Sequence, residues 1–280
     1  MKAFDAADLD PGFLAERKGE HRVSVCIPAH DEEPTVGAVV EAIVRGLVDR
    51  HGLVDEVLVV DDGSTDGTAA VAAAAGARVV PTEERRGKGE ALWTSLRASS
   101  GDVVCWVDAD IRGFDAHFVS GLVGPLLVDP DVDFVKGRYE RDGGRVTELL
   151  ARPVIATLFP HLACFDQPLA GEYAGRRRLL ERLPFAAGYG VDLALLVDVA
   201  AEVGVDRMAE VDLGVRVHRN RPLEELTPAA VSVLQAALRR ADVEVPERTV
   251  LRRPGAEPTV IDAAERPPLV EVPGYPRAGG

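Results

Sequence analysis

The chain has 280 residues, which is enough for a full-sized hydrophobic core in one large domain or two small ones. Its 46% hydrophobic and 28% charged residues are ordinary for a soluble globular protein. The formal net charge of −14 argues against general nucleic-acid binding, which uses a surplus of Lys and Arg, so we expect no nucleic-acid partner.

The N-terminal residues and the cysteines bear on the compartment in which the protein works. The N-terminus carries acids where a signal peptide needs a basic and then an apolar run. No apolar run approaches the roughly 18–20 residues that cross a bilayer. Cys26, Cys105 and Cys164 form no CxxC pair and are interpreted as buried thiols in a reducing compartment. These features predict a cytoplasmic protein without a membrane partner.

Strands and helices alternate along the first half of the chain. Apolar and β-branched runs predict strands at 23–28, 54–62, 77–82 and 102–111, and helical spacing predicts helices at 33–52, 68–77, 87–101 and 114–127. This alternation is typical of βαβ units. Because the strands are continuously apolar, we expect a parallel sheet that is covered on both faces.

Acidic residues follow three of these strands at the edge where such sheets bind their ligands, outside the carboxyl ends of the strands. They are Asp31 and Glu32, Asp61 and Asp62, and Asp108 and Asp110. Two carboxylates at the end of a buried strand cost free energy unless a cation balances them. We therefore expect the Asp108-Ala109-Asp110 segment to hold a hard divalent cation that neutralises a diphosphate.

The alternation changes after about Asp133. We expect a strand at 132–141, a helix at 145–159, a loop into a helix at 167–184, a helix at 191–204, a strand near 207–220 and a helix at 227–243. Many prolines and charges from Glu244 onward predict an extended tail. The predicted division is an N-terminal extension (1–20), a nucleotide-sugar-binding part (21–135), an acceptor-binding part (136–225), and a C-terminal helix with the tail (226–280).

The segments IPAHDEE and VVDDGSTDGT resemble those of family-2-like glycosyltransferases of the GT-A fold, and the resemblance covers roughly residues 23–221. It implies an α/β fold with a Rossmann-like, mostly parallel sheet, helices on both faces and an acceptor-binding lobe. Within the family, GKGEAL, VDADI, GGRVTEL, QPLAGEYAGRR, GYGVD and VRVHRNRPL resemble segments of retaining glucosyltransferases. These transfer glucose from UDP-glucose to the 2-hydroxyl of 3-phosphoglycerate and use Mg²⁺ or Mn²⁺. The resemblance also suggests a homodimer.

The resemblance implies the following site residues. The donor-binding residues would be Pro28, Ala29, Glu32, Asp62, Lys88, Asp108, Leu169, Tyr189 and Asp192, and the metal ligands would be Asp110 and His218. The acceptor phosphate and carboxylate would be bound by Gly144, Arg145, Thr147 and Asn220. Asp108, Asp192 and Arg216 would be catalytic, with Arg216 offsetting the charge of the leaving group.

Asp192 stands where the family commonly has Glu, so its carboxylate is one methylene shorter and the donor stays open. The alternative is transfer of mannose from GDP-mannose to the same acceptor, or use of both donors. A nucleotidyltransferase would need a Gly-rich loop with Arg or Lys after the first strand, and PAHDEEPT has the wrong chemistry. A catalytically silent sugar-nucleotide binder is a further alternative, which tight UDP binding without turnover would support.

Overall fold

The structure is a computed structural model that describes residues 1–84, 86–140, 144–215 and 222–276. An eight-stranded sheet runs through the molecule in the order β1-β9-β6-β7-β5-β2-β3-β4. The strands are β1 (Lys2–Asp5), β2 (Val23–Ala29), β3 (Glu56–Asp61), β4 (Arg78–Pro81), β5 (Val103–Trp106), β6 (Phe134–Glu140), β7 (Tyr173–Arg176) and β9 (Met208–Val215). β7 is antiparallel to β5 and β6, and every other pairing described in this sheet is parallel. The predicted mostly parallel sheet is confirmed.

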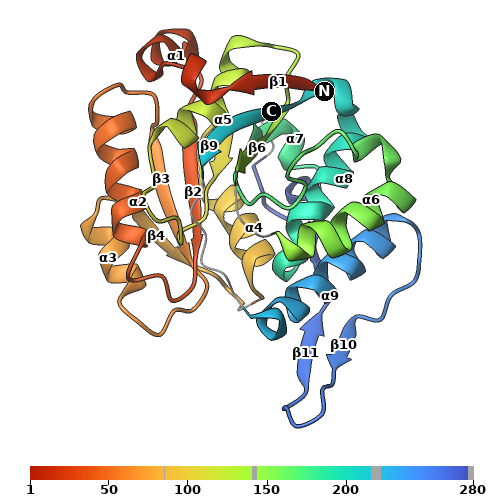
Figure 1. The fold of residues 1–280 in the computed structure, drawn as a ribbon. Helices are drawn as coiled ribbons and strands as arrows, with labels where there is room; N and C mark the ends of the chain where they lie inside the picture. Colours follow the sequence, from red (N-terminus) through yellow and green to blue (C-terminus); the bar gives the residue numbers. More distant parts are fainter. Residues whose placement is uncertain (85, 141–143, 216–221, 277–280) are drawn as a thin grey trace.

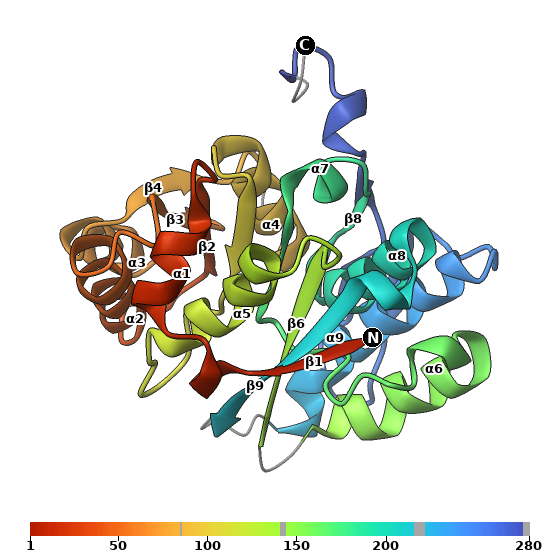
Figure 2. The same ribbon diagram turned by 90° about the horizontal axis from the view of Figure 1, so that it is seen from above.

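Helices cover both faces of the sheet, as predicted (Figure 1; Figure 2). One face carries α1 (Pro11–Lys18), α2 (Val36–Ile43) with its continuation η2 (Val44–Asp49), α3 (Thr68–Ala74) and α5 (His117–Val128). The other face carries α4 (Lys88–Ala98), α6 (Arg152–Leu158), α7 (Arg177–Leu180), α8 (Val191–Val203) and α9 (Leu223–Arg240). Short helical turns fall at η1 (Ala6–Asp8), η3 (Thr147–Ala151), η4 (Pro160–Leu162), η5 (Gly188–Gly190), η6 (Val205–Arg207) and η7 (Leu269–Glu271).

Alternation of side chains along the central strands explains the two cores. Val25 and Ile27 of β2 enter the core beneath α2, whereas Cys26 between them enters the core beneath α4. The apolar stripe predicted for the first long helix is confirmed, because Val36, Val39, Val40, Ile43 and Leu47 are all buried. Both faces of the sheet are therefore covered by helices, which leaves the ends of the strands as the place where a ligand can reach the sheet.

Two elements of the sheet differ from the sequence-based expectation. Residues 173–176, expected as part of a loop, form β7 in the middle of the sheet between β5 and β6. The N-terminal extension is part of the sheet as well, because β1 pairs in parallel with β9 at the edge. The parts predicted to bind acceptor and nucleotide sugar thus share one sheet.

The C-terminal segment is folded, whereas the sequence predicted an extended tail. β10 (Arg248–Leu251) and β11 (Thr259–Asp262) form an antiparallel hairpin, which projects from the body in Figure 1. β12 (Glu265–Arg266) then pairs with β8 (Phe185–Ala186). Leu269 is completely buried beyond this pairing. The segment therefore fastens itself to the body of the protein.

Two smaller observations concern the cysteines and the helices. Cys26 and Cys105 are buried as predicted, whereas Cys164 is exposed, so that prediction was wrong for one of the three. Within the described residues, none of the helices combines the length and the apolar character that a membrane span requires.

Candidate active site

The loops after β2 and β3 are joined to one another by hydrogen bonds. The Asp31 amide donates to Ser64 Oγ over 3.0 Å, and the Thr65 amide donates to Asp31 Oδ1 over 2.7 Å. The Gly67 amide donates to Glu33 Oε2 over 2.9 Å. Asp31 adopts a left-handed backbone conformation with φ +55°, which this network holds in place. The two motifs that carry the family resemblance therefore form one rigid edge.

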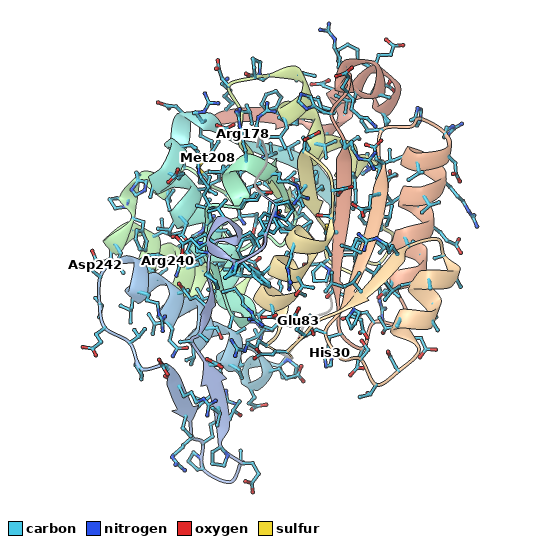
Figure 3. The ribbon with its side chains drawn as sticks, turned by 180° about the vertical axis from the view of Figure 1, so that it is seen from behind. His30, Glu83, Arg178, Met208, Arg240 and Asp242 are labelled. Atoms are coloured by element: carbon cyan, nitrogen blue, oxygen red, sulfur yellow. The ribbon has the colours of Figure 1, made fainter. Side chains whose placement is uncertain are left out.

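The predicted donor-binding residues near β2 and β3 lie at the carboxyl ends of these strands. Pro28 and Ala29 end β2, and Glu32 is half-buried in the loop that follows. Asp62 is buried and accepts hydrogen bonds from Thr82 Oγ1 and the Gly87 amide, both over 3.0 Å. Figure 3 shows His30 and Glu83, which follow β2 and β4, at the same end of the sheet. The carboxyl ends of these strands thus converge, as predicted.

Lys88, at the start of α4, joins the two carboxylates that were predicted to face the donor. Its Nζ lies 3.0 Å from Asp108 Oδ1 and 3.2 Å from Asp192 Oδ2. Tyr173 donates its hydroxyl to Asp192 Oδ1 over 3.1 Å. Burial alone would lower the pKa of Lys88, but Asp108 and Asp192 outweigh it and hold that pKa well above its ordinary value. Lys88 is therefore a fixed positive charge in this site.

The same burial acts on the acids of the cluster. Burial raises the pKa of Asp192, and the ammonium groups of Lys88 and Lys136 oppose that rise. Burial likewise keeps the pKa of Tyr173 well above its ordinary value, so its hydroxyl stays protonated and donates. The structure thus brings Lys88, Asp108 and Asp192 together from α4, the loop after β5 and α8, three elements that are far apart in sequence.

Glycines make the close approach around Lys88 possible. A Cβ at Gly89 would overlap the carbonyl oxygen of Ala186 in β8. Gly87 has φ +79°, a conformation that other residues rarely adopt. A Cβ at Gly171 would lie 2.5 Å from Asp108 Oδ2 and would also overlap Lys88 Nζ. Only a bare backbone fits against this ion-pair cluster.

The remaining predicted donor and acceptor residues differ in their exposure and in the elements that carry them. Leu169 is half-buried in the loop that leads to β7, and Tyr189 is 47% exposed in η5, just before α8. Gly144 has φ +87°, Arg145 is half-buried, and Thr147 is buried at the start of η3. η3 packs against α9, so this acceptor segment lies on the same face as α4 and α8.

Three predicted residues, Arg216, His218 and Asn220, lie outside the described residues. Asp110 follows β5 and is half-buried. The described residues contain no group of three or more His, Cys, Asp or Glu side chains placed to hold a metal ion. A carboxylate oxygen from Asp110 nevertheless suits Mg²⁺ or Mn²⁺ chemically, and an imidazole suits Mn²⁺. The oxygen and nitrogen atoms of the two predicted ligands therefore suit the expected cation, and Asp110 is the one of them that lies within the described residues.

Lys136 and Tyr173 were not identified from the sequence. Lys136, in β6, is completely buried, and its Nζ donates to the Ala170 carbonyl oxygen over 2.8 Å. One signal in the sequence could have revealed it, since a lysine directly follows the apolar pair Phe134-Val135 within a predicted strand. Tyr173 lies within the family-like segment QPLAGEYAGRR, but the resemblance implies no role for it.

The arginines at 176–178 lie away from this site. Asp133 is buried, and it pairs with Arg178 over 3.1 Å and with Arg176 over 3.3 Å. Figure 3 places Arg178 beside Met208, where β9 begins, at the opposite edge of the sheet from His30. The ion pairs of Asp133 with Arg176 and Arg178 therefore stabilise the edge at which the parallel strands begin. β7 ends at this edge because it is antiparallel to β5 and β6.

Comparisons with known proteins point to one group of enzymes. Residues 24–189 match the sequence model of glycosyl transferase family 2. Glucosyl-3-phosphoglycerate synthase of Mycolicibacterium smegmatis is 49% identical over 82% of this chain and 81% of its own length. The crystal structure of glucosyl-3-phosphoglycerate synthase from Mycobacterium tuberculosis with Mn²⁺, UDP-glucose and phosphoglyceric acid has a TM-score of 0.88 and 45% identity, covering 93% of this chain and 94% of that chain. Mannosyl-3-phosphoglycerate synthase from Rubrobacter xylanophilus has a TM-score of 0.89 and 37% identity, covering 97% of each chain.

Proposed function

The chain belongs to glycosyl transferase family 2, and we propose that it transfers glucose from UDP-glucose to 3-phosphoglycerate. Its fold is the GT-A fold of that family. The acceptor atom in this proposal is the 2-hydroxyl oxygen of 3-phosphoglycerate, and the configuration of glucose is retained.

One observation of the structure carries the proposal. Lys88 binds Asp108 and Asp192 at the carboxyl edge of the sheet, where a parallel α/β sheet binds its ligand. A buried ion-pair cluster of this kind is more costly than a packed apolar contact, so its place in a ligand-binding edge indicates function. The similarity to an enzyme crystallised with UDP-glucose and phosphoglyceric acid gives the cluster its substrate class.

The chain's residues would divide the work as follows. Pro28, Ala29, Glu32 and Asp62 would hold uridine and ribose on the rigid edge formed by the β2 and β3 loops. Lys88, Asp108, Leu169, Tyr189 and Asp192 would hold the sugar and the donor phosphates. Gly144, Arg145, Thr147 and Asn220 would bind the acceptor.

The bond between the anomeric carbon of glucose and the diphosphate breaks, and the acceptor oxygen forms its bond from the same face. In this proposal the acceptor proton passes to the departing diphosphate, which is the front-face mechanism that the family resemblance implies. Arg216 would offset the charge that develops on that leaving group. Asp110 and His218 would hold Mg²⁺ or Mn²⁺, which when bound neutralises the diphosphate.

A donor-by-acceptor activity matrix tests the proposal. Purified protein is assayed for UDP or GDP release with UDP-glucose or GDP-mannose, with and without 3-phosphoglycerate, Mg²⁺ and a chelator. We expect acceptor-dependent UDP release that the chelator abolishes. No UDP release above background with the full set of reagents would contradict the proposal.

The GDP-mannose arm is included because two observations favour it. The structure resembles a mannosyl-3-phosphoglycerate synthase across 97% of the chain, and the carboxylate of Asp192 is one methylene shorter than the family's Glu. Competition between the two donors in one reaction decides which sugar is preferred.

Three further predictions belong to this proposal. Residues 21–135 would bind the donor, residues 136–225 would bind the acceptor, and residues 226–280 would complete the fold. The protein would act in the cytoplasm. It would also assemble as a homodimer through the C-terminal helix, which sedimentation velocity can test.

A further inference from the structure

A row of polar side chains crosses the sheet beside the proposed donor site. In the register of the sheet, Lys136 of β6 stands opposite Tyr173 of β7 and opposite Glu210 of β9. Residues directly opposite one another project from the same face, so these three side chains lie next to each other. Lys136 Nζ lies 4.7 Å from the centre of the Tyr173 ring. All three residues are buried, with Lys136 and Tyr173 at 0% exposure and Glu210 at 3%.

Two members of this row hold one loop by its backbone. Lys136 Nζ donates to the Ala170 carbonyl oxygen over 2.8 Å. Glu210 Oε1 accepts from the Asp166 amide over 2.9 Å and from the Gln167 amide over 3.3 Å. Residues 166–170 are thus held near one end by the Lys136 ammonium group and near the other by the Glu210 carboxyl group, rather than by a strand ladder. A hydrogen bond to a charged group is stronger than a neutral one, so the loop has little freedom to shift.

That loop is the wall of the ion-pair cluster. It contains Leu169, whose backbone belongs to the proposed glucose site, and it continues into Gly171. The Gly171 backbone lies so close to Lys88 and Asp108 that a single added methyl would overlap them. A displacement of the loop would therefore move the wall against which both charged groups rest.

The third member of the row reaches the cluster directly. Tyr173 lies beneath Lys136 and donates its hydroxyl to Asp192 over 3.1 Å. Lys136 thus binds the loop directly, at the Ala170 carbonyl oxygen. It also contacts the ring of Tyr173, whose hydroxyl binds Asp192. Burial lowers the pKa of Lys136 to about 8, so the ammonium form still predominates at pH 7.

We propose that Lys136 is a positioning residue for the donor sugar, which, together with Glu210, fixes the loop 166–171 against Lys88 and Asp108. This inference rests on the proposed function and adds a specific role to a residue that does not face the substrate. Retaining a fully buried ammonium group costs stability, which a purely structural position could avoid with an apolar side chain.

The test variant is Lys136→Met, which keeps the length and the apolar stem of the side chain and removes the ammonium group. Loss of a charged hydrogen bond to the loop should lower kcat/KM for UDP-glucose about 10- to 100-fold. The Kd for UDP, measured by titration calorimetry with Mg²⁺, should change several-fold less than kcat/KM, because the uridine part of UDP is bound at the edge formed by β2 and β3. Hydrogen exchange of the amides in 166–171 should become faster.

Lys18→Met is the matched control. Lys18 is another buried lysine, and its Nζ donates to the carbonyl oxygens of Gly52 and Leu53 and to Asp55 over 2.8–3.2 Å. These partners lie at the amino ends of the strands, so we expect lower stability with kcat/KM and loop exchange unchanged. If Lys136→Met does not fold, Glu210→Gln replaces the carboxyl group at the other end of the loop and should lower kcat/KM about 3- to 10-fold.

The outcomes separate the two hypotheses. Wild-type protein that transfers no glucose contradicts the proposed function, and the exchange of residues 166–171 then decides the anchoring role by itself. In active protein, a Lys136→Met variant with kcat/KM within twofold of wild type overturns the inference. An equal loss in UDP affinity and in kcat/KM for UDP-glucose overturns it as well. Unchanged hydrogen exchange of the amides in 166–171 does the same.

Discussion

Replacing Gly171 with alanine introduces one methyl group directly into the Lys88–Asp108 contact. The new Cβ would lie 2.5 Å from Asp108 Oδ2, whereas ordinary contacts begin at 3.4 Å, so the carboxylate has to retreat by about 0.9 Å. Misplacing a reacting or binding group by about 1 Å costs about 100-fold in rate. We therefore expect kcat/KM for UDP-glucose to fall about 100-fold. Overpacking of this kind costs about 1–3 kcal/mol of stability, which leaves the protein folded at 25 °C.

The assay is UDP release under donor-limited conditions, with thermal unfolding followed by circular dichroism. Gly12→Ala is the control, because it adds the same methyl in α1, where the nearest atom lies 3.2 Å away in the Asp10 side chain. Alanine favours helix over glycine by about 1 kcal/mol, so this variant should be as stable as wild type or more so, and fully active. A Gly171→Ala variant with kcat/KM within twofold of wild type would refute the steric reasoning.

Three other expectations follow from the described contacts. Asp110→Ala should abolish metal-dependent transfer while the melting temperature stays within a few degrees, and activity above a tenth of wild type would contradict the metal role. Burial raises the pKa of Glu210 to about 7, above its value in the unfolded chain. The stability that protonated Glu210 contributes is therefore fully present below about pH 4.5 and is lost as the pH rises through 7. In Glu210→Gln, the free energy of unfolding measured with urea should change less with pH across this window than in wild type. The Arg240 side chain is only 8% exposed and pairs with Asp198 at 2.7 Å and Glu265 at 2.5 Å. Arg240→Met should therefore cost about 3–5 kcal/mol in urea unfolding, and a loss below 1 kcal/mol would contradict a structural role for these ion pairs.

The sequence predicted those parts of the site whose signals are local. Asp62 and Asp108 follow apolar strands, and strand direction alone brings such ends to one edge. β7 was missed because Tyr173–Arg176 is a short strand containing alanine and glycine, which have weak strand propensity. Its place in the sheet is set by pairing with β5 and β6 rather than by its own residues.

Lys136 was missed for a related reason. A lysine within a strand pattern is usually interpreted as a solvent-facing residue, and only the pairing of β6 with β7 and β9 shows that it is buried. The folded C-terminal segment could not be predicted either. Arg266 binds Glu90 over 2.7–2.8 Å across 176 residues of sequence, and no window of the chain contains both partners.

That long-range fastening has a consequence for the order in which the enzyme matures. The strand order of β2 to β5 can form early during synthesis, yet the helix that carries Lys88 gains its outer support only when β12 has left the ribosome and reached β8 and Glu90. A chain that stops before Glu265 would still form the sheet, but α4 would lack the contact of Arg266 with Glu90. We therefore expect α4 to be fully supported only after residues 265–266 have been synthesised, which is later than the synthesis of β2 to β5.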